Sequence, residues 1–200
     1  YGVDKIYSST SNRAIQTAKP TCELMKIDME LLDFANEGHA WNDFTIQRGN
    51  KTTWLFQDYE SKVLFADNSV ISLGNNWFEH PLLAEYKQGI DRVYNESYEF
   101  FKSLGYEHIR NTGRYNVVKS NDERIALFAH QGFGLAFLSV VLDIPYPIIA
   151  NHFDMCHTGI TAIEFKEENG YAIPKMLTLS SDAHLYNEGL PTKYNNILYL

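Results

Sequence analysis

The sequence contains little cysteine. Cys22 and Cys156 are its two cysteines, and they lie far apart in the chain. Zinc fingers and small disulfide-stapled domains need several cysteines at short spacings, so the sequence shows neither pattern. Two isolated thiols are typical of a protein in a reducing compartment, and we therefore expect a cytoplasmic location.

Long apolar runs and an excess of positive charge are also missing. No segment reaches the roughly 18 consecutive apolar residues of a membrane helix, and the first residues lack a basic stretch followed by an apolar one. The 17 Lys and Arg are outnumbered by 25 Asp and Glu, which gives a net charge of -8. This balance argues against nucleic acid or an anionic membrane as the main partner.

What is present predicts one α/β domain. The 200 residues are 44% hydrophobic and 14% aromatic, enough to bury a sizeable core. Apolar strand patterns alternate with amphipathic helix patterns, which favours a three-layer α/β/α sandwich. The expected strands are 4–9, 115–119, 124–129, 160–165 and 171–179, and the expected helices begin at Asn12, span 79–104 and follow Gly132. Pro20 should kink or divide the first helix, and Pro174 should make its strand an edge or irregular strand.

Residues 38–76 are rich in aromatic side chains and show no periodicity. Together with the helix that follows, they form a region from about 38 to 105 that we expect to be inserted over the core as a helical and aromatic lid. Such insertions over the carboxyl edge of a sheet often control substrate access. Plain packing of an inserted subdomain would give the same pattern.

Arg13 is the first candidate for phosphate chemistry. It lies in the first turn of a helix that directly follows the strand 4–9. Free N–H groups at a helix start and a guanidinium beside them form a cradle for an oxyanion. An ordinary exposed arginine would give the same local sequence.

His130 is the second candidate. It follows the apolar strand 124–129 and precedes Gly132, which marks a helix start. Ligands of open α/β sheets bind at the carboxyl ends of parallel strands, so the imidazole is expected in that crevice. A structural histidine is the alternative.

Glu37 is the third candidate, a carboxylate that follows an apolar segment. Partial burial would raise its pKa and let it donate a proton to a leaving alkoxide. An exposed loop glutamate is the alternative.

Together, the segments around Arg13, Glu37 and His130 resemble the histidine phosphatase superfamily. The resemblance is to its branch of cofactor-dependent phosphoglycerate mutases and small-molecule phosphatases. Ser8-Ser9 through Arg13 is similar to its serine-rich segment, and Ala129-His130-Gln131-Gly132 to its second active-site histidine. Segments 153–161 and 182–185 extend the resemblance. It implies a phosphoglycerate mutase-like fold with a mostly parallel central sheet.

The resemblance also implies residue roles. Arg13, His130, Gln131 and His157 would bind phosphate, and Glu37 and His130 would be catalytic, with Glu37 as the general acid. The partner would be a small-molecule phosphomonoester or inorganic phosphate. No cofactor or metal is expected. His152, Asp154, Cys156 and His157 are acceptable zinc ligands, but their spacing does not suit one site.

One family feature is missing. The family's phosphorylated histidine lies in an Arg-His-Gly segment, which these 200 residues do not contain. We expect this first strand to lie upstream, between the strands that start near Lys5 and Arg124, and we expect the given chain to be inactive without it. Unpaired strand edges would also favour association with a second copy as a homodimer.

The resulting prediction is a phosphomonoester hydrolase that forms a phosphohistidine. A mutase is the first alternative, although Glu37-Gly38-His39-Ala40-Trp41 departs from the mutase pattern Glu-Arg-His-Tyr-Gly. A catalytically inactive phosphate-binding or regulatory module is the second.

Overall fold

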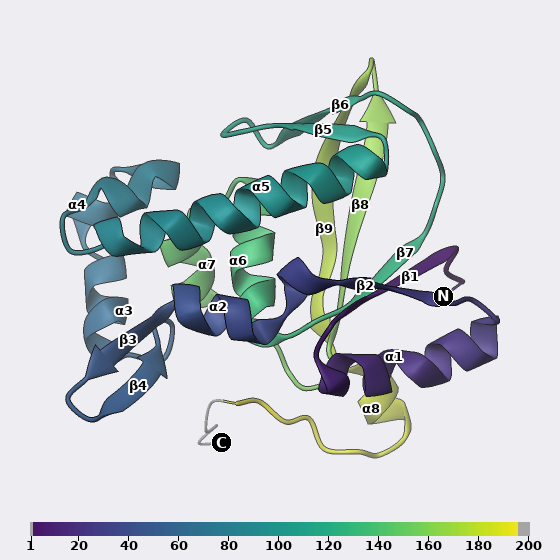
Figure 1. Ribbon diagram of the computed structural model, residues 1–200, viewed down its shortest axis with the longest axis horizontal. Helices are drawn as coiled ribbons and strands as arrows, with labels where there is room; N and C mark the ends of the chain where they lie inside the picture. Colours follow the sequence, from purple (N-terminus) through teal and green to yellow (C-terminus); the bar gives the residue numbers. More distant parts are fainter. Residues whose placement is uncertain (1, 196–200) are drawn as a thin grey trace.

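The computed structural model describes residues 2–195 and has an α/β architecture (Figure 1). Its parallel sheet has the order β2-β1-β7, with β1 at Lys5–Ser9, β2 at Met29–Leu32 and β7 at Ile125–Phe128. Helix α1 (Asn12–Met25) connects β1 to β2. The predicted parallel sheet is confirmed. Because its strands run in one direction, their carboxyl ends meet at one edge.

Strand β1 is the centre of this sheet. Ile6 is 2% exposed, and Ser8 and Ser9 are fully buried, as expected for a strand with neighbours on both sides. Helix α1 packs against the sheet through small side chains, Ala14 and Ala18. Pro20 does not divide the helix, which continues as one element from Asn12 to Met25.

The expected position of a missing strand is wrong. β1 pairs directly with β7, from Lys5 opposite Ile125 to Ser8 opposite Phe128, so no strand fits between them. The other edge of β7 has no strand partner within residues 2–195. All four β7 residues are only partly buried, which fits a strand that is covered on one side.

The later strands form a second, antiparallel sheet in the order β5-β6-β9-β8. Its members are β5 (Tyr106–Ile109), β6 (Arg114–Val117), β8 (Ile160–Glu168) and β9 (Tyr171–Ser181). β9 is therefore an inner strand. Of the two alternatives predicted from Pro174, an edge or an irregular strand, the second fits, because the pairing of β9 with β8 shifts register on both sides of Ala162. Pro174 is tolerated because β6 pairs with β9 only at Tyr171 and Ala172, which leaves no partner for an N–H at position 174.

The aromatic region 38–105 forms several regular elements, of which the sequence pattern predicts only the last: that helix matches the one expected over 79–104 but begins later, at Lys87. They are α2 (Glu37–Asp43), β3 (Thr45–Arg48), β4 (Lys51–Trp54), α3 (Tyr59–Phe65), α4 (Asn68–Ile71), the 3-10 helices Gly74–Glu79 and Ala84–Tyr86, and α5 (Lys87–Ser103). A further 3-10 helix, Asp33–Ala35, precedes α2. The ring of Tyr146 stacks on Phe44 at 4.9 Å and lies 5.5 Å from Trp77, so this region shares the main core. Its role as a lid stays a prediction.

Helix α6 (Gln131–Leu142) passes through the middle of the fold and is fixed at both ends (Figure 1). At its carboxyl end, Asp143 adopts a left-handed conformation with φ of 50°. Its Oδ2 accepts a hydrogen bond from the Gly113 backbone N–H at 2.7 Å and lies 3.0 Å from His108 Nε2. Burial alone would raise the pKa of Asp143, but these hydrogen bonds hold it below its usual value. The hairpin β5-β6 thus anchors the helix that follows His130.

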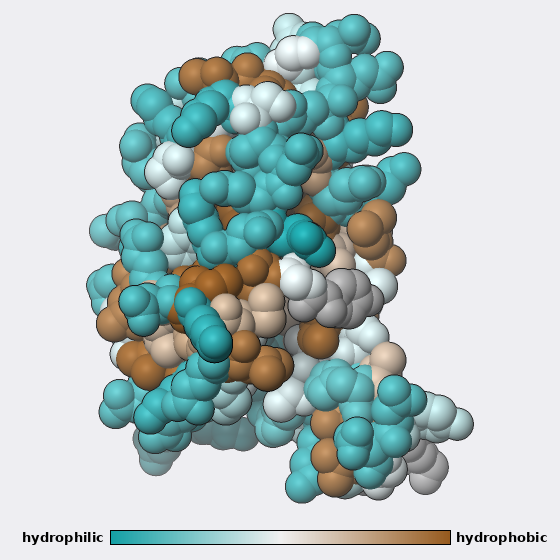
Figure 2. Space-filling model, turned by 90° about the vertical axis from the view of Figure 1, so that its right-hand side faces the viewer, coloured by the Kyte–Doolittle hydropathy of each residue, from teal (hydrophilic) through white to brown (hydrophobic). Residues whose placement is uncertain are grey.

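The remaining elements are α7 (Tyr146–His152) and α8 (Ala183–Asn187). Within residues 2–195, no helix is long and apolar enough to cross a membrane. Figure 2 shows apolar surface gathered in the middle of one face of the molecule. The antiparallel sheet also exposes apolar side chains, with Ile173 60% and Leu177 57% exposed. Association into a homodimer stays a prediction.

Candidate functional site

His130 lies where two parallel strands end. It lies two residues after the end of β7 and is the N-cap residue of α6, and its Nε2 is 3.2 Å from Ser9 Oγ at the end of β1. Burial lowers the pKa of His130, and the positive charge of Arg13 lowers it further. The resting imidazole is therefore biased toward its neutral form. A bound oxyanion would have the opposite effect, because negative charge favours the imidazolium.

Glu37 is held at the start of the same helix. Its Oε1 accepts a hydrogen bond from the Gly132 N–H and its Oε2 from the Phe133 N–H, both at 3.0 Å. Asn36 sets this geometry, because its side chain caps α2 by accepting from the Gly38 N–H at 2.9 Å. Burial raises the pKa of Glu37, and the two amides and the charge of Arg13 offset only part of that rise.

A tryptophan packs on this helix start. A Cβ atom at Gly132 would lie 2.4 Å from the ring of Trp54 and 2.9 Å from Glu37 Oε1, so only glycine fits there. Trp54 in turn meets Trp41 edge to face, with ring centroids 4.9 Å apart. The sequence pattern missed this indole pair, although the glycine after His130 was a signal of close approach.

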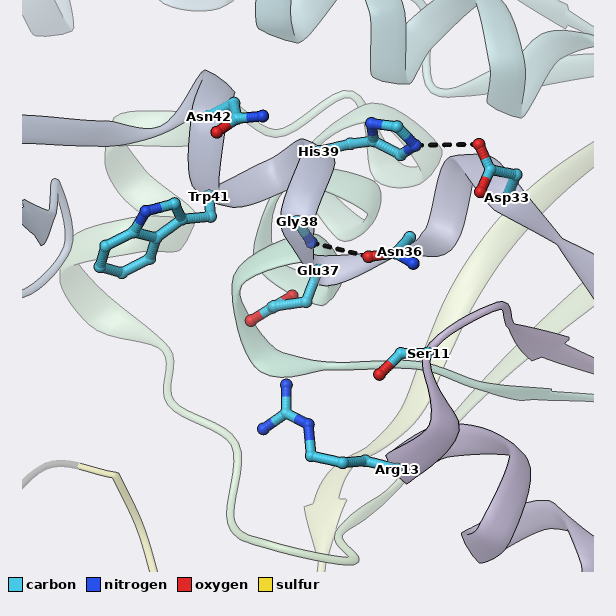
Figure 3. A pocket seen from close by; sticks show the side chains of 9 residues that line it. All are labelled: Ser11, Arg13, Asp33, Asn36, Glu37, Gly38, His39, Trp41 and Asn42. Carbon is cyan, nitrogen blue, oxygen red and sulfur yellow. Dashed lines mark hydrogen bonds and ion pairs between the residues drawn. The ribbon is translucent and has the colours of Figure 1, made fainter.

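A cavity of about 590 Å³ opens beside these groups (Figure 3). Arg13 and Glu37 both line it, and Figure 3 shows the guanidinium pointing toward the carboxylate. The structure thus brings Arg13, Glu37 and His130 to the carboxyl edge of one sheet.

Asp33 lines the cavity too and was missed by the sequence analysis. It is the first residue after β2, and its Oδ1 accepts from Thr10 Oγ1 at 3.0 Å while its Oδ2 lies 2.9 Å from His39 Nε2. The hydrogen bonds that Asp33 accepts from His39 and, to a smaller extent, from Thr10 lower the pKa of Asp33. Recognising β2 in the sequence would have placed Asp33 at the sheet edge.

Gln131 and His157 are connected to a different segment. The Gln131 side chain donates to Asp154 and accepts from Asn195 Nδ2 at 2.7 Å. His157 Nε2 lies 2.8 Å from Asn195 Oδ1, and the His157 side chain is exposed. The hydrogen bonds and ion pairs of the described chain do not join His157 to Arg13, Glu37 or His130.

The four residues His152, Asp154, Cys156 and His157, whose side chains are of a type that binds zinc, are not gathered as a metal site in the described part of the chain. Across residues 2–195, no group of three or more His, Cys, Asp or Glu side chains is arranged to hold a metal ion.

Comparison of the sequence with protein-family models and with curated proteins finds no match. Comparison of the structure does find similar folds. A phosphoserine phosphatase from Entamoeba histolytica, solved with 3-phosphoglyceric acid, matches with a TM-score of 0.54 and 17% identity over 92% of this chain and 77% of that one. A mycobacterial glucosyl-3-phosphoglycerate phosphatase matches with a TM-score of 0.52 and 14% identity over 90% of this chain and 78% of that one. The expected phosphoglycerate mutase-like α/β fold is thereby confirmed.

Replacing Glu37 with Gln tests the environment of the carboxyl group. Because burial raises the pKa of Glu37 in the folded state, the folded protein binds the carboxyl proton more tightly than the unfolded chain does. The stability that comes from this proton is therefore lost as pH rises through the folded-state pKa. The Gln variant also leaves one α6 amide without an acceptor, which costs about 1–3 kcal/mol. We expect the wild type to exceed Glu37→Gln in unfolding free energy by more at pH 5 than at pH 7.5, measured by urea titration.

The control for this measurement is Glu99→Gln, which changes an exposed carboxylate on α5. Its stability difference from the wild type should stay within about 0.5 kcal/mol at both pH values. A Glu37→Gln difference that is the same at pH 5 and pH 7.5 would show that the folded environment does not raise this pKa.

Proposed function

We propose that this chain forms the phosphate-binding and proton-donating part of a histidine-phosphatase-type phosphomonoester hydrolase. The observation that supports the proposal is the convergence of Arg13, Glu37 and His130 at the carboxyl ends of β1 and β7. These three residues come from separate segments of the sequence. Arg13 supplies a guanidinium, Glu37 a proton donor and His130 an imidazole, which are groups that phosphoryl transfer uses. The fold shared with known phosphatases agrees with this assignment.

Arg13 and His130 bind the phosphoryl oxygens in this proposal. A guanidinium offers paired N–H donors in a fixed plane, which suits two oxygens of one phosphate. Binding of the dianion raises the proton affinity of His130, whose imidazolium then donates a second charged hydrogen bond. Such donors act most strongly on the charge that develops on the equatorial oxygens in the transition state.

Glu37 supplies the proton for the leaving oxygen. As the P–O ester bond breaks and a nitrogen–phosphorus bond forms on the attacking histidine, the carboxylic acid transfers its proton to the alkoxide. The resulting carboxylate then accepts a proton from the water that hydrolyses the phosphohistidine. The raised pKa of Glu37 suits both steps, because it keeps the protonated form populated nearer neutral pH.

The attacking histidine is assigned by resemblance to an Arg-His-Gly segment, which these 200 residues do not contain. Gln131 and His157 are proposed as further phosphate ligands. Both would have to exchange their hydrogen bonds to Asn195 for bonds to the ligand. A phosphate-binding module without turnover is the second candidate.

Inorganic phosphate should stabilise the chain through Arg13. A ligand that binds only the folded state, present at ten times its Kd, raises the free energy of unfolding by about 1.4 kcal/mol. For a domain of this size, that raises the Tm by about 3–6 °C. Arg13→Ala should weaken phosphate binding at least about tenfold, since charged hydrogen bonds are worth about 1.5–3 kcal/mol. Thermal melts with and without phosphate measure both effects.

Lys19→Ala is the matched control, because Lys19 is an exposed cation farther along α1. It should keep the wild-type response to phosphate. Equal responses in Arg13→Ala and the wild type would remove Arg13 from the site.

The 200-residue chain should show no turnover of p-nitrophenyl phosphate above background, because the proposed acid and phosphate ligands are present without the attacking histidine. A steady-state assay with His130→Ala as a second sample checks this. Robust turnover that disappears in His130→Ala would mean that a residue within the chain attacks phosphorus.

A further inference from the structure

The cavity beside Arg13 has an uneven charge distribution. Of the nine described residues that line it, Arg13 is the one Lys or Arg, whereas Asp33 and Glu37 are both acidic. A phosphomonoester already brings negative charge to this single guanidinium. The cavity therefore offers no second arginine or lysine to an ester whose leaving group is also anionic.

In a step that rests on the function proposed above, we place the leaving group in the cavity that Glu37 and Asp33 both line. Its oxygen has to reach Glu37, the first residue of α2. The cavity wall around that point is built by the segment from Asp33 to Asn42, including His39 and Trp41. Figure 3 shows Glu37 on the Arg13 side of this segment, with Asp33 and His39 bonded to each other farther along it.

Asp33 remains an exposed anion at this place. Its side chain is 74% exposed, and its carboxylate keeps one oxygen on Thr10 and the other on His39. Hydrogen bonds from His39 and Thr10 lower its pKa, so the charged form persists at neutral pH. A carboxylate in the substrate would be repelled by the charge of Asp33, whereas a hydroxyl group could donate a hydrogen bond to it.

We propose that Asp33 determines specificity: the cavity selects phosphomonoesters with uncharged, hydroxylated leaving groups and disfavours those that bear a carboxylate. Trp41 supports the same substrate class. Its indole is 37% exposed at the cavity wall and offers an apolar face to the carbon skeleton of a polyol.

A pair of ligands that differ in one group tests this proposal. Glycerol 3-phosphate and 3-phosphoglycerate share a phosphate and a three-carbon chain, and a CH₂OH in the first is a carboxylate in the second. Their affinities for the 200-residue chain would be measured by calorimetry at pH 8, with inorganic phosphate as a reference. The variants are Asp33→Asn and the control Asp28→Asn, which removes the same charge just before β2, at the opposite end of that strand.

The wild type should bind glycerol 3-phosphate more tightly than 3-phosphoglycerate. Two exposed like charges a few ångströms apart interact by about 1 kcal/mol in water, so Asp33→Asn should improve the relative affinity for 3-phosphoglycerate about three- to tenfold. Asp28→Asn should leave the ratio unchanged. Inorganic phosphate should bind all three proteins.

Two failures can be told apart. If inorganic phosphate does not bind, or binds as well to Arg13→Ala, the proposed function fails and this specificity fails with it. If phosphate binds through Arg13 but the ratio of the two esters is the same in Asp33→Asn, the specificity proposal alone is overturned.

Discussion

The bond between the Glu37 carboxylate and the start of α6 is the interaction on which the site depends. The first N–H groups of a helix have no partners within the helix. Glu37 accepts from two of them, on Gly132 and Phe133. This contact joins the segment that follows β2 to the helix that follows β7. It therefore holds Glu37 at the helix start whose N-cap residue is His130.

Other features of the site follow from this bond. Gly132 must be glycine because a Cβ atom there would clash with Trp54 and with Glu37. Asn36 caps α2 and so directs Glu37, its first residue, toward α6. At the far end of α6, Asp143 fixes the helix to the hairpin of β5 and β6. The position of His130 is thus set by contacts at both ends of one helix.

Burial moves the two titratable groups toward their neutral forms. The pKa of Glu37 is raised and that of His130 is lowered, in both cases chiefly by burial. Arg13 also favours neutral His130, whereas its charge partly offsets the rise at Glu37. The site therefore combines the permanent cation of Arg13, two groups poised to exchange protons, and an exposed carboxylate at Asp33. A phosphate dianion is the ligand that would change this balance most, because it favours the charged form of His130.

The sequence predicted the parts of this site that follow from chain direction. Arg13 and His130 each come just after a strand, and parallel strands end at one edge, so their proximity could be expected. The order of the strands in the sheet could not be predicted, because an apolar pattern indicates a strand but does not show which strands pair with it. The direct pairing of β1 with β7 therefore contradicted the expected gap. Strand β2 escaped notice because four partly exposed residues give little pattern, and Asp33 was missed with it.

A crystal structure of the chain with bound vanadate or phosphate tests the central claim most directly. The account predicts one oxyanion within hydrogen-bonding distance of both the Arg13 guanidinium and His130 Nε2, with the Glu37 carboxyl group on the side where an ester oxygen would leave. An oxyanion bound elsewhere, with Arg13 and His130 directed to different surfaces, would contradict it.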